Sequence, residues 1–485
     1  GVSSDSIGAD SGAAGSVILY GDSLRIEGGA VTSSTSSSAA GGQVVIDVQD
    51  LTISGGLVSS GTTGLGDAGD VSVRAERFAM DGGAVSSSSG SCSAGPCAAG
   101  NAGDVTLDAG SVVIGGGALI SSDVGLTGEG GTIRITADEV RIENGGLASR
   151  TFGAGNTGSV FVEAPGLAMV DARISSNAEP GSSGNAGLVS VRSATVSMDR
   201  SLITSTTFGA GNAGAIEISA RSLEMSGSAI SSDASNCADG SCASTGDAGS
   251  VEIDADDIVM TNDSRISSGT EGSGDAGSVL VTADALTIDD SDISTLTLGS
   301  GDAGDVRLAA GTIDVGNGAL ITSSAGSCTD GSCVSSGDAG SVTLVSDELR
   351  VHDGAIIASA TRGIGNAGSV IVEAGRVSVE SGAIVTSNAA EGDTGNAGLV
   401  RVSAASLSID GGTITSETFG AGSAGNVVIE VASLDVGTDG RISSSASPCR
   451  EGDCVASGNA GTVTLAAVDL DVHHGGTITS ETSGP

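Results

Sequence analysis

Residues 274–295 read GDAGSVLVTADALTIDDSDIST, and this stretch contains the pattern on which the fold depends. A glycine motif, Gly-Asp-Ala-Gly, comes first, at 274–277. Apolar and polar residues then alternate through 279–283, again through 286–288, and once more around Ile293. Alternation with a period of two is typical of β-strands and does not fit helical spacing. The stretch therefore predicts three short strands separated by turns.

The glycine motif recurs along the whole chain, with Asp or Asn at its second position in most copies. Neighbouring copies such as those ending at Gly277 and Gly304 are 27 residues apart, and four intervals are lengthened to between 34 and 36 residues. A fixed period of this size is typical of solenoid proteins. The motif or a variant of it ends at Gly15, Gly42, Gly69, Gly103, Gly131, Gly158, Gly187, Gly214, Gly249, Gly277, Gly304, Gly340, Gly368, Gly398, Gly425 and Gly461.

Three strands per repeat cannot bury their apolar side alone, whereas stacked repeats pair each strand with its copy and align the inward Val, Ile and Leu. The sequence thus predicts an all-β, single-stranded parallel β-helix of about 16–17 coils with three short strands each, as one continuous domain over residues 1–485. The composition agrees, because rows of identical side chains at ~4.8 Å suit small and β-branched residues, and the chain has 5 Phe, 1 Tyr and no Trp. Pairs such as Gly82-Gly83, Asn144-Gly145 and Gly411-Gly412 predict turns with positive φ before the third strand.

The charge restricts the partners. The chain has 59 acidic and 18 basic residues, all of the latter Arg, and a net charge of −41. Such a field opposes nucleic acid and anionic lipid, and it leaves cations and neutral or basic partners. We find neither an apolar stretch of the ~18–20 residues that span a membrane nor a signal sequence at Gly1, so we expect a mature product or a fragment with no direct membrane insertion.

The eight cysteines form four pairs of one spacing, each inside one of the four lengthened intervals. Even number and identical spacing predict disulfides that close loop insertions near 90–99, 235–244, 326–335 and 447–456, and hence an oxidising, extracytoplasmic location. Zinc is disfavoured because no His lies near the pairs and the closest pairs are three coils, ~14 Å, apart. The predicted disulfides join Cys92 with Cys97, Cys237 with Cys242, Cys328 with Cys333, and Cys449 with Cys454.

The order of glycine motif, alternating Val/Ile, Leu-x-Ile, Gly-Gly and then Ile-Ser-Ser (230–232) or Ile-Thr-Ser (414–416) covers nearly all 485 positions. It resembles the repeat shafts of filamentous-haemagglutinin-like exoproteins, bacterial surface adhesins of the two-partner secretion type. The resemblance implies a right-handed β-helix on a Gram-negative outer surface, an outer-membrane transporter as export partner, and an adhesive or matrix role. Two departures are the regular Cys loops and the lack of a recognisable amino-terminal secretion domain.

Candidate binding residues are few. The second position of the motif is Asp247, Asp275, Asp302 and Asp338 in four consecutive copies, which raises the hypothesis of a calcium column. The alternative is that Asp and Asn only cap a turn, because Asn holds the same position elsewhere. The histidines, His352, His473 and His474, are interpreted as exposed turn residues. The Phe of three Thr-Phe-Gly loops, at 151–153, 207–209 and 418–420, is expected to pack in the core under a corner, and the alternative is an exposed contact with a glycan or a neighbouring rod.

The favoured function is a structural and adhesive extracellular rod with no catalytic residues and no cofactor, apart from calcium as an option. Its partners would be host-cell or matrix glycans or proteins, or further copies of the chain stacked end to end. One alternative is a polysaccharide lyase or hydrolase, which would need a non-repeating acidic and basic cluster on one coil face. The densest acidic stretches, 254–257 and 284–292, recur instead as outward polar positions. Another alternative is a calcium-bridged surface layer or matrix fibre.

Overall fold

The computed structural model describes residues 1–8, 10–90, 100–236, 244–326, 336–389, 394–447 and 458–482. These residues form an all-β structure without helices, a parallel β-solenoid of about 15 turns with coils of about 28 residues. The all-β, parallel β-helix prediction is therefore confirmed. The chain divides into two compact units, one of residues 1–224 with 228–249 and one of residues 225–227 with 250–485. The right-handed sense of winding and the single continuous domain stay predictions.

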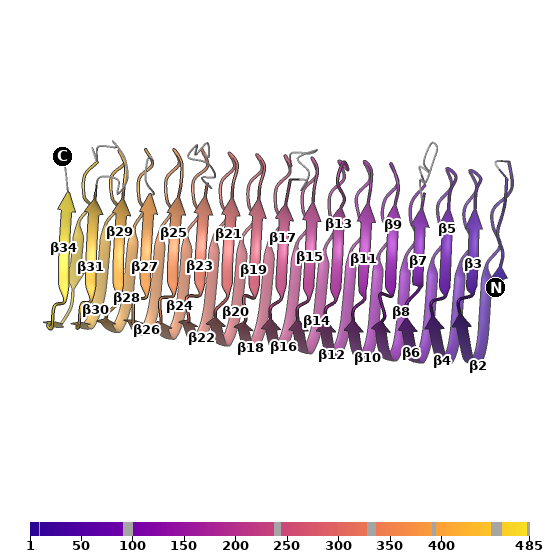
Figure 1. The fold of residues 1–485 in the computed structure, drawn as a ribbon, viewed down its shortest axis with the longest axis horizontal. Coiled ribbons are helices and arrows are strands. Elements are labelled where there is room, and N and C mark those ends of the chain that lie inside the picture. Colours follow the sequence, from indigo (N-terminus) through magenta and orange to yellow (C-terminus); the bar gives the residue numbers. More distant parts are fainter. Residues whose placement is uncertain are drawn as a thin grey trace. The chain divides into compact units, whose positions relative to one another are not determined.

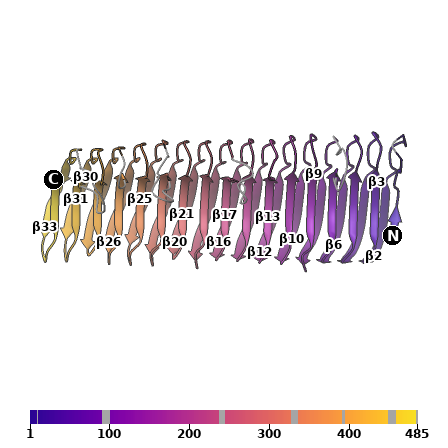
Figure 2. The same ribbon diagram turned by 45° about the horizontal axis from the view of Figure 1, so that its top comes forward.

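Most coils contain one long and one short strand, and in Figures 1 and 2 each kind stands in a row of parallel arrows within each unit. The long strands are β2 (Val17–Glu27), β4 (Val44–Ser54), β6 (Val71–Asp81), β8 (Val105–Gly115), β10 (Ile133–Glu143), β12 (Val160–Val170), β14 (Val189–Asp199), β16 (Ile216–Ser226), β18 (Val251–Thr261), β20 (Val279–Asp289), β22 (Val306–Gly316), β24 (Val342–Val351), β26 (Val370–Glu380), β28 (Val400–Asp410) and β30 (Val427–Val436). In the last coil two four-residue strands, β32 (Val463–Ala466) and β33 (Asp469–Val472), take the place of a long strand.

The short strands pair only with short strands, in parallel and in register, as in Ile293↔Ile321. They are β1 (Val2–Ser3), β3 (Ala30–Thr35), β5 (Leu57–Thr62), β7 (Ala84–Ser89), β9 (Leu119–Val124), β11 (Gly146–Thr151), β13 (Arg173–Ala178), β15 (Leu202–Thr207), β17 (Ala229–Ala234), β19 (Arg265–Thr270), β21 (Asp292–Thr297), β23 (Leu320–Ala325), β25 (Ile356–Thr361), β27 (Ile384–Ala389), β29 (Thr413–Thr418), β31 (Arg441–Ala446) and β34 (Thr477–Thr482). None of the described residues belongs to a helix long and apolar enough to cross a membrane.

The prediction of three short strands per coil is wrong for most coils, because the first two are one continuous strand. In β18 the buried residues alternate up to Ala255, and the alternation resumes one position out of phase at Ile258. Asp256 and Asp257 are both exposed there, and the pairing with β20 omits Asp256. The strand therefore bends without ending. In the sequence, a bend and a turn shift the alternation in the same way, so the pattern does not distinguish them. In the last coil the chain does break at this point, into β32 and β33.

The turns between long and short strands agree with the sequence. Gly82, Gly83 and Gly411 have φ of 67°, 85° and 70°, as the Gly-Gly pairs predicted. At 144–146 the residue with positive φ is Asn144, at 49°, and not one of the glycines that follow it. Asn tolerates this region because its short polar side chain bonds locally to the backbone.

The glycine motif serves the stacking of coils, and its described glycines have no positive φ. A Cβ atom built on Gly103 would lie 2.5 Å from the carbonyl oxygen of Gly69, the equivalent residue one coil earlier, and 2.9 Å from Oγ of Ser87. The first glycine of the motif is closer still to its counterpart, as at Gly100 over Gly66. The backbones of two successive coils are in contact at this corner and leave no space for a side chain. The motif therefore requires glycine because a Cβ atom would overlap the preceding coil.

A row of buried hydroxyls bonds the motifs of successive coils together. Ser359, the fourth residue of β25, is fully buried. Its Oγ donates to the carbonyl oxygen of Gly340 and accepts from the N–H of Gly368, both at 2.8 Å. The same pair of bonds is made at Ser60, Ser87, Ser122, Ser176, Ser205, Ser232, Ser323, Ser387, Ser416 and Ser444. The inner surface of the coil is thus polar along this row.

Replacing Gly103 by Ala tests the packing at the corner. The new methyl group has no space, so we expect Gly103→Ala to lower the free energy of unfolding by about 1–3 kcal/mol. Gly21→Ala is the control, because a Cβ there meets no atom within 4 Å, and its effect should stay within about 0.5 kcal/mol. Urea unfolding of both variants measures the difference, and equal stabilities would contradict the steric argument.

Replacing Ser359 by Ala tests the hydroxyl row. The variant leaves the half-buried carbonyl of Gly340 and N–H of Gly368 without this partner, which costs about 1–3 kcal/mol. Ser346→Ala is the matched control, since the Oγ of Ser346 is buried and makes no hydrogen bond. Thermal melts should therefore show a clear drop for Ser359→Ala and none for Ser346→Ala. If the two variants melt together, the row is not a stabilising element.

Candidate functional site: an open groove along the short strands

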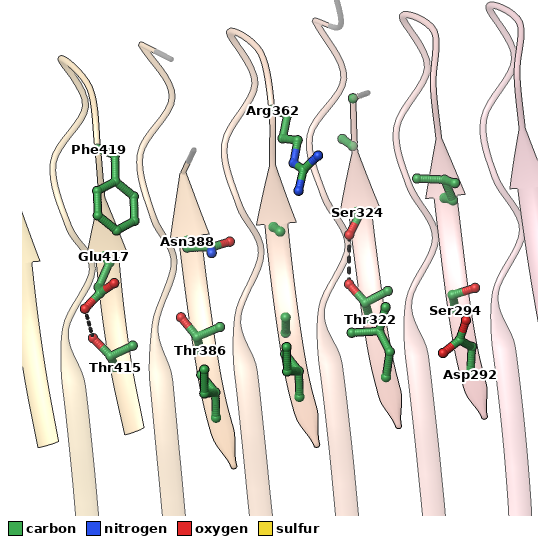
Figure 3. A pocket seen from close by; sticks show the side chains of 18 of the residues that line it. Asp292, Ser294, Thr322, Ser324, Arg362, Thr386, Asn388, Thr415, Glu417 and Phe419 are labelled. Atoms are coloured by element: carbon green, nitrogen blue, oxygen red, sulfur yellow. Dashed lines mark hydrogen bonds between the residues drawn. The ribbon is translucent and has the colours of Figure 1, made fainter. Parts of the chain in front are cut away.

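In the second unit an open groove of about 800 Å³ crosses β21, β23, β25, β27 and β29 (Figure 3). Three rows of outward side chains line it, one each from the first, third and fifth residues of the strands. The third residues are small and nearly buried, so they form its floor. On four of the five strands they are Thr322, Ala358, Thr386 and Thr415, with exposed fractions between 3 % and 8 %, and on β21 the half-buried Ser294 takes this place.

The local sequence explains this shape. Because side chains alternate along a strand, every second residue of a six-residue strand faces outward. The first position carries an aliphatic side chain in three neighbouring coils, at Leu320, Ile356 and Ile384. The residue that follows the strand lines the opposite edge, with Arg362 and Phe419. The groove therefore has an apolar edge, a floor of small and hydroxyl side chains, and an edge with a cation and a ring.

Polar groups point into the groove at several places. Thr415 donates to Oε1 of Glu417 at 3.1 Å, as Figure 3 shows. The Oδ1 atom of Asn388 is buried without a hydrogen-bond partner among the described residues. Asp292 lies 3.7 Å from the Arg265 guanidinium, and burial raises the pKa of Asp292 while Arg265 opposes that rise. The carboxylates of Glu417 and Asp292 can bind the hydroxyl groups of a polar ligand.

The two carboxylates in the groove are too far apart to act on one bond. Asp292 lies on β21 and Glu417 on β29, and four strand spacings of ~4.8 Å separate them by ~19 Å. Glycoside hydrolysis by a pair of carboxylates requires about 5–9.5 Å between them. The geometry of the groove fits the binding of an extended molecule along the stack of strands, with contacts repeated from coil to coil.

A mixed cluster on the short strands of the first unit has the composition that the enzyme alternative requires. Arg150 donates to Asp123 through Nε at 3.0 Å and through Nη2 at 2.8 Å. The Arg150 guanidinium also lies 5.7 Å from the centre of the Phe152 ring. Because Asp123 is held by both bonds, it is engaged in an ion pair and is not free to act as a base. This pair was not predicted from the sequence, because its members are 27 residues apart, one coil, and only the register brings them together.

Glu179 completes this cluster. Burial raises the pKa of Glu179, and the positive charge of Arg150 opposes that rise. The native state therefore binds this proton more tightly than the unfolded chain does. The stability contributed by Glu179 is fully present below its ordinary pKa and is lost as the pH rises through its raised pKa.

The pH dependence of Glu179→Gln follows from that sign. At low pH the wild-type carboxyl is protonated and resembles the amide, so both proteins should have similar stability. As the pH rises towards 7, the variant should gain in unfolding free energy relative to the wild type. Urea unfolding at a series of pH values measures the difference, with Glu217→Gln, at an exposed position, as control for net charge. A constant difference over this range would contradict the assignment.

The proposed calcium column has a structural role of its own. Asp247 lies in the first unit and the other three residues in the second. Oδ1 of Asp275 accepts from the N–H of Asp302, and Oδ1 of Asp302 from that of Asp338, both at 2.8 Å. The amide oxygen of Asn212 accepts from the N–H of Asp247 in the same way, at 2.9 Å. Asp and Asn are thus equivalent because each supplies one acceptor to the next coil. Calcium binding at this column stays a prediction.

The Phe and His residues predicted from the sequence differ in their surroundings. Phe152 is 49 % exposed and Phe419 is half-buried, so neither packs in the core. The prediction for His352 is wrong. It is not an exposed turn residue, because its side chain is only 15 % exposed and its Nε2 lies 3.1 Å from Oδ1 of Asp314.

The predicted disulfides lie outside the described residues, as do nearly all of the four loop insertions. The structure therefore describes no pairing of cysteines, and the four disulfides stay predictions. The cysteines outside the described ranges are Cys92, Cys97, Cys237, Cys242, Cys328, Cys333, Cys449 and Cys454.

Comparisons of the chain with protein-family models, with curated proteins and with solved structures find no match.

Proposed function

We propose that this chain is a structural and adhesive shaft, part of a secreted bacterial surface protein, and that the groove of its second unit binds a neutral extended glycan. The observation that carries the proposal is the groove itself, which crosses five short strands in succession. Its floor repeats small side chains at the strand spacing of ~4.8 Å, and Thr322, Thr386 and Thr415 add hydroxyl groups to it. A polymer with a repeating unit can use such rows because each unit meets a similar set of contacts.

The scaffold role is supported by the way the coils are joined. Each coil bonds to the next through two parallel ladders and through the buried serine row. In a solenoid every repeat contacts its neighbours, so stability grows with the number of coils and the structure can project a surface at a distance. An extracellular location, export through an outer-membrane transporter and disulfide-closed loops belong to this proposal.

The ligand class is argued from charge and from side chains. A net charge of −41 opposes polyanionic glycans. Phe419 offers an aromatic face, and Arg362 and Asn388 offer polar groups near it. Aromatic rings with hydrogen-bonding neighbours suit the apolar faces and hydroxyl groups of neutral sugars. Host-cell or matrix glycans of this kind are the proposed partners.

Two substitutions in the groove test the proposal. A screen on a glycan array should first identify a neutral polysaccharide that binds the full chain. Phe419→Ala and Arg362→Ala should each weaken its binding about fivefold, because a lost stacking contact or hydrogen bond is worth ~1 kcal/mol. Ile364→Ala is the matched control, since Ile364 is 65 % exposed on the same loop as Arg362 but does not line the groove.

The expected result is a loss for both groove variants and none for the control. Two results contradict the proposal. Either no neutral glycan binds, or Ile364→Ala weakens binding as much as Phe419→Ala does. Cleavage of the polysaccharide during the assay would instead favour the enzyme alternative.

A further inference from the structure

Three metal-ligating side chains meet on the long-strand side of the second unit. Asp435 lies on β30, Asp471 on β33, and His473 directly follows β33. One ligand atom from each of them lies within 4.8 Å of the other two. The two aspartates are paired in register on adjacent strands, and Nε2 of His473 lies 2.9 Å from Oδ1 of Asp435. Two carboxylates and one imidazole nitrogen thus converge from two successive coils.

The imidazole of His473 is held in place on its other sides. The ring lies over Gly437 of the preceding coil, where an added Cβ would be 3.3 Å from Cε1 of His473. Its backbone N–H donates to the carbonyl oxygen of Val436 at 3.0 Å. The second ring nitrogen, Nδ1, forms a hydrogen bond with Nδ1 of His474. Such a partner holds the orientation of a metal-binding histidine, so that Nε2 faces the carboxylates.

A related arrangement lies around His352, and it differs from this one at two positions, the residue paired with the aspartate and the partner of Nδ1. His352 lies over Gly316 and its Nε2 contacts Asp314, as His473 does with Gly437 and Asp435. The residue paired in register with Asp314 is Arg350, whereas the residue paired with Asp435 is Asp471. At His352 the neighbouring strand position holds a guanidinium, which forms an ion pair with Glu380, and the second carboxylate is Asp353, which contacts Nδ1 of His352. At the site of Asp435 and Asp471, His473 is the one basic group in ion-pair contact with either aspartate among the described residues.

An aspartate in place of an arginine makes the site at His473 more negative, and this indicates that the site accommodates a cation. Two carboxylates at the strand spacing of ~4.8 Å repel each other unless a cation lies between them. A neutral imidazole is a good ligand for borderline transition ions, whereas calcium prefers oxygen ligands only. Three protein ligands with an open fourth position are the common arrangement of zinc sites that retain a water.

We propose that Asp435, Asp471 and His473 bind one zinc ion, with water as the fourth ligand. The ion bridges two successive coils and neutralises part of the charge at that place. Because it binds the folded chain, it stabilises that state by mass action. This site is separate from the groove and does not depend on the proposed glycan binding.

Zinc titration of the full chain by calorimetry, after free thiols are blocked with iodoacetamide, tests the site. We expect one zinc ion per chain at this site and a rise of the melting temperature with zinc. His473→Ala and Asp471→Arg should abolish this binding, and Asp471→Arg introduces the residue type found at Arg350. His474→Ala should weaken it about tenfold, because it removes only the orienting partner. Cobalt in place of zinc gives an absorption band that reports the ligand set directly.

His352→Ala is the matched control, because it alters the related arrangement beside Arg350 and should leave zinc binding unchanged. Circular dichroism of the metal-free variants checks that each retains its β-structure. The proposal is overturned if the wild type binds no zinc, if His473→Ala and Asp471→Arg bind it as tightly as the wild type, or if calcium binds these residues in preference to zinc.

Discussion

The structure depends on how closely successive coils approach at the glycine motif. The parallel ladders set the distance between coils at ~4.8 Å, and at this corner the backbones of two coils are in direct contact. No side chain fits there, which requires glycine. The peptide groups of the motif also need partners, because they cannot all pair along the ladder. The buried serine row and the Asp/Asn row supply those partners. The repeated glycine, serine and Asp/Asn positions are thus all explained by the close approach of successive coils.

Much of the fold could be predicted from the sequence because a solenoid repeats the same local pattern. The motif spacing predicted the coil length, and the alternation of residues such as Val279 and Val281 predicted the buried columns. The bend within the long strands could not be told from a turn, since both shift the alternation by one position. The serine row was not predicted either. A serine near Ile357 gives the same pattern whether it faces solvent or, as Ser359 does, the inside of the coil.

The candidate sites were less predictable for a related reason. The partners Asp123 and Arg150, or Asp435 and Asp471, are one coil apart in the chain, and only the register places them side by side. Once the register is known, the regular columns of equivalent residues help to locate sites, because a residue that differs from its column stands out. Phe419 and Arg362 interrupt the rows of the groove, and Asp471 stands where the arrangement at His352 has Arg350. In a repeated fold, binding sites are expected where the repeat is broken.

The central claim is that equivalent residues of successive coils lie directly above one another. Distances between spin labels measure this, with labels introduced as unnatural amino acids because the chain has 8 Cys. Arg307, Thr343, Ile371, Arg401, Val428 and Thr464 occupy one column of the long strands. Labels at Arg307 and Val428 should lie ~19 Å apart, and labels at Arg307 and Thr464 ~24 Å, with narrow distributions. Broad distributions, or a difference between the pairs far from ~5 Å, would contradict the account.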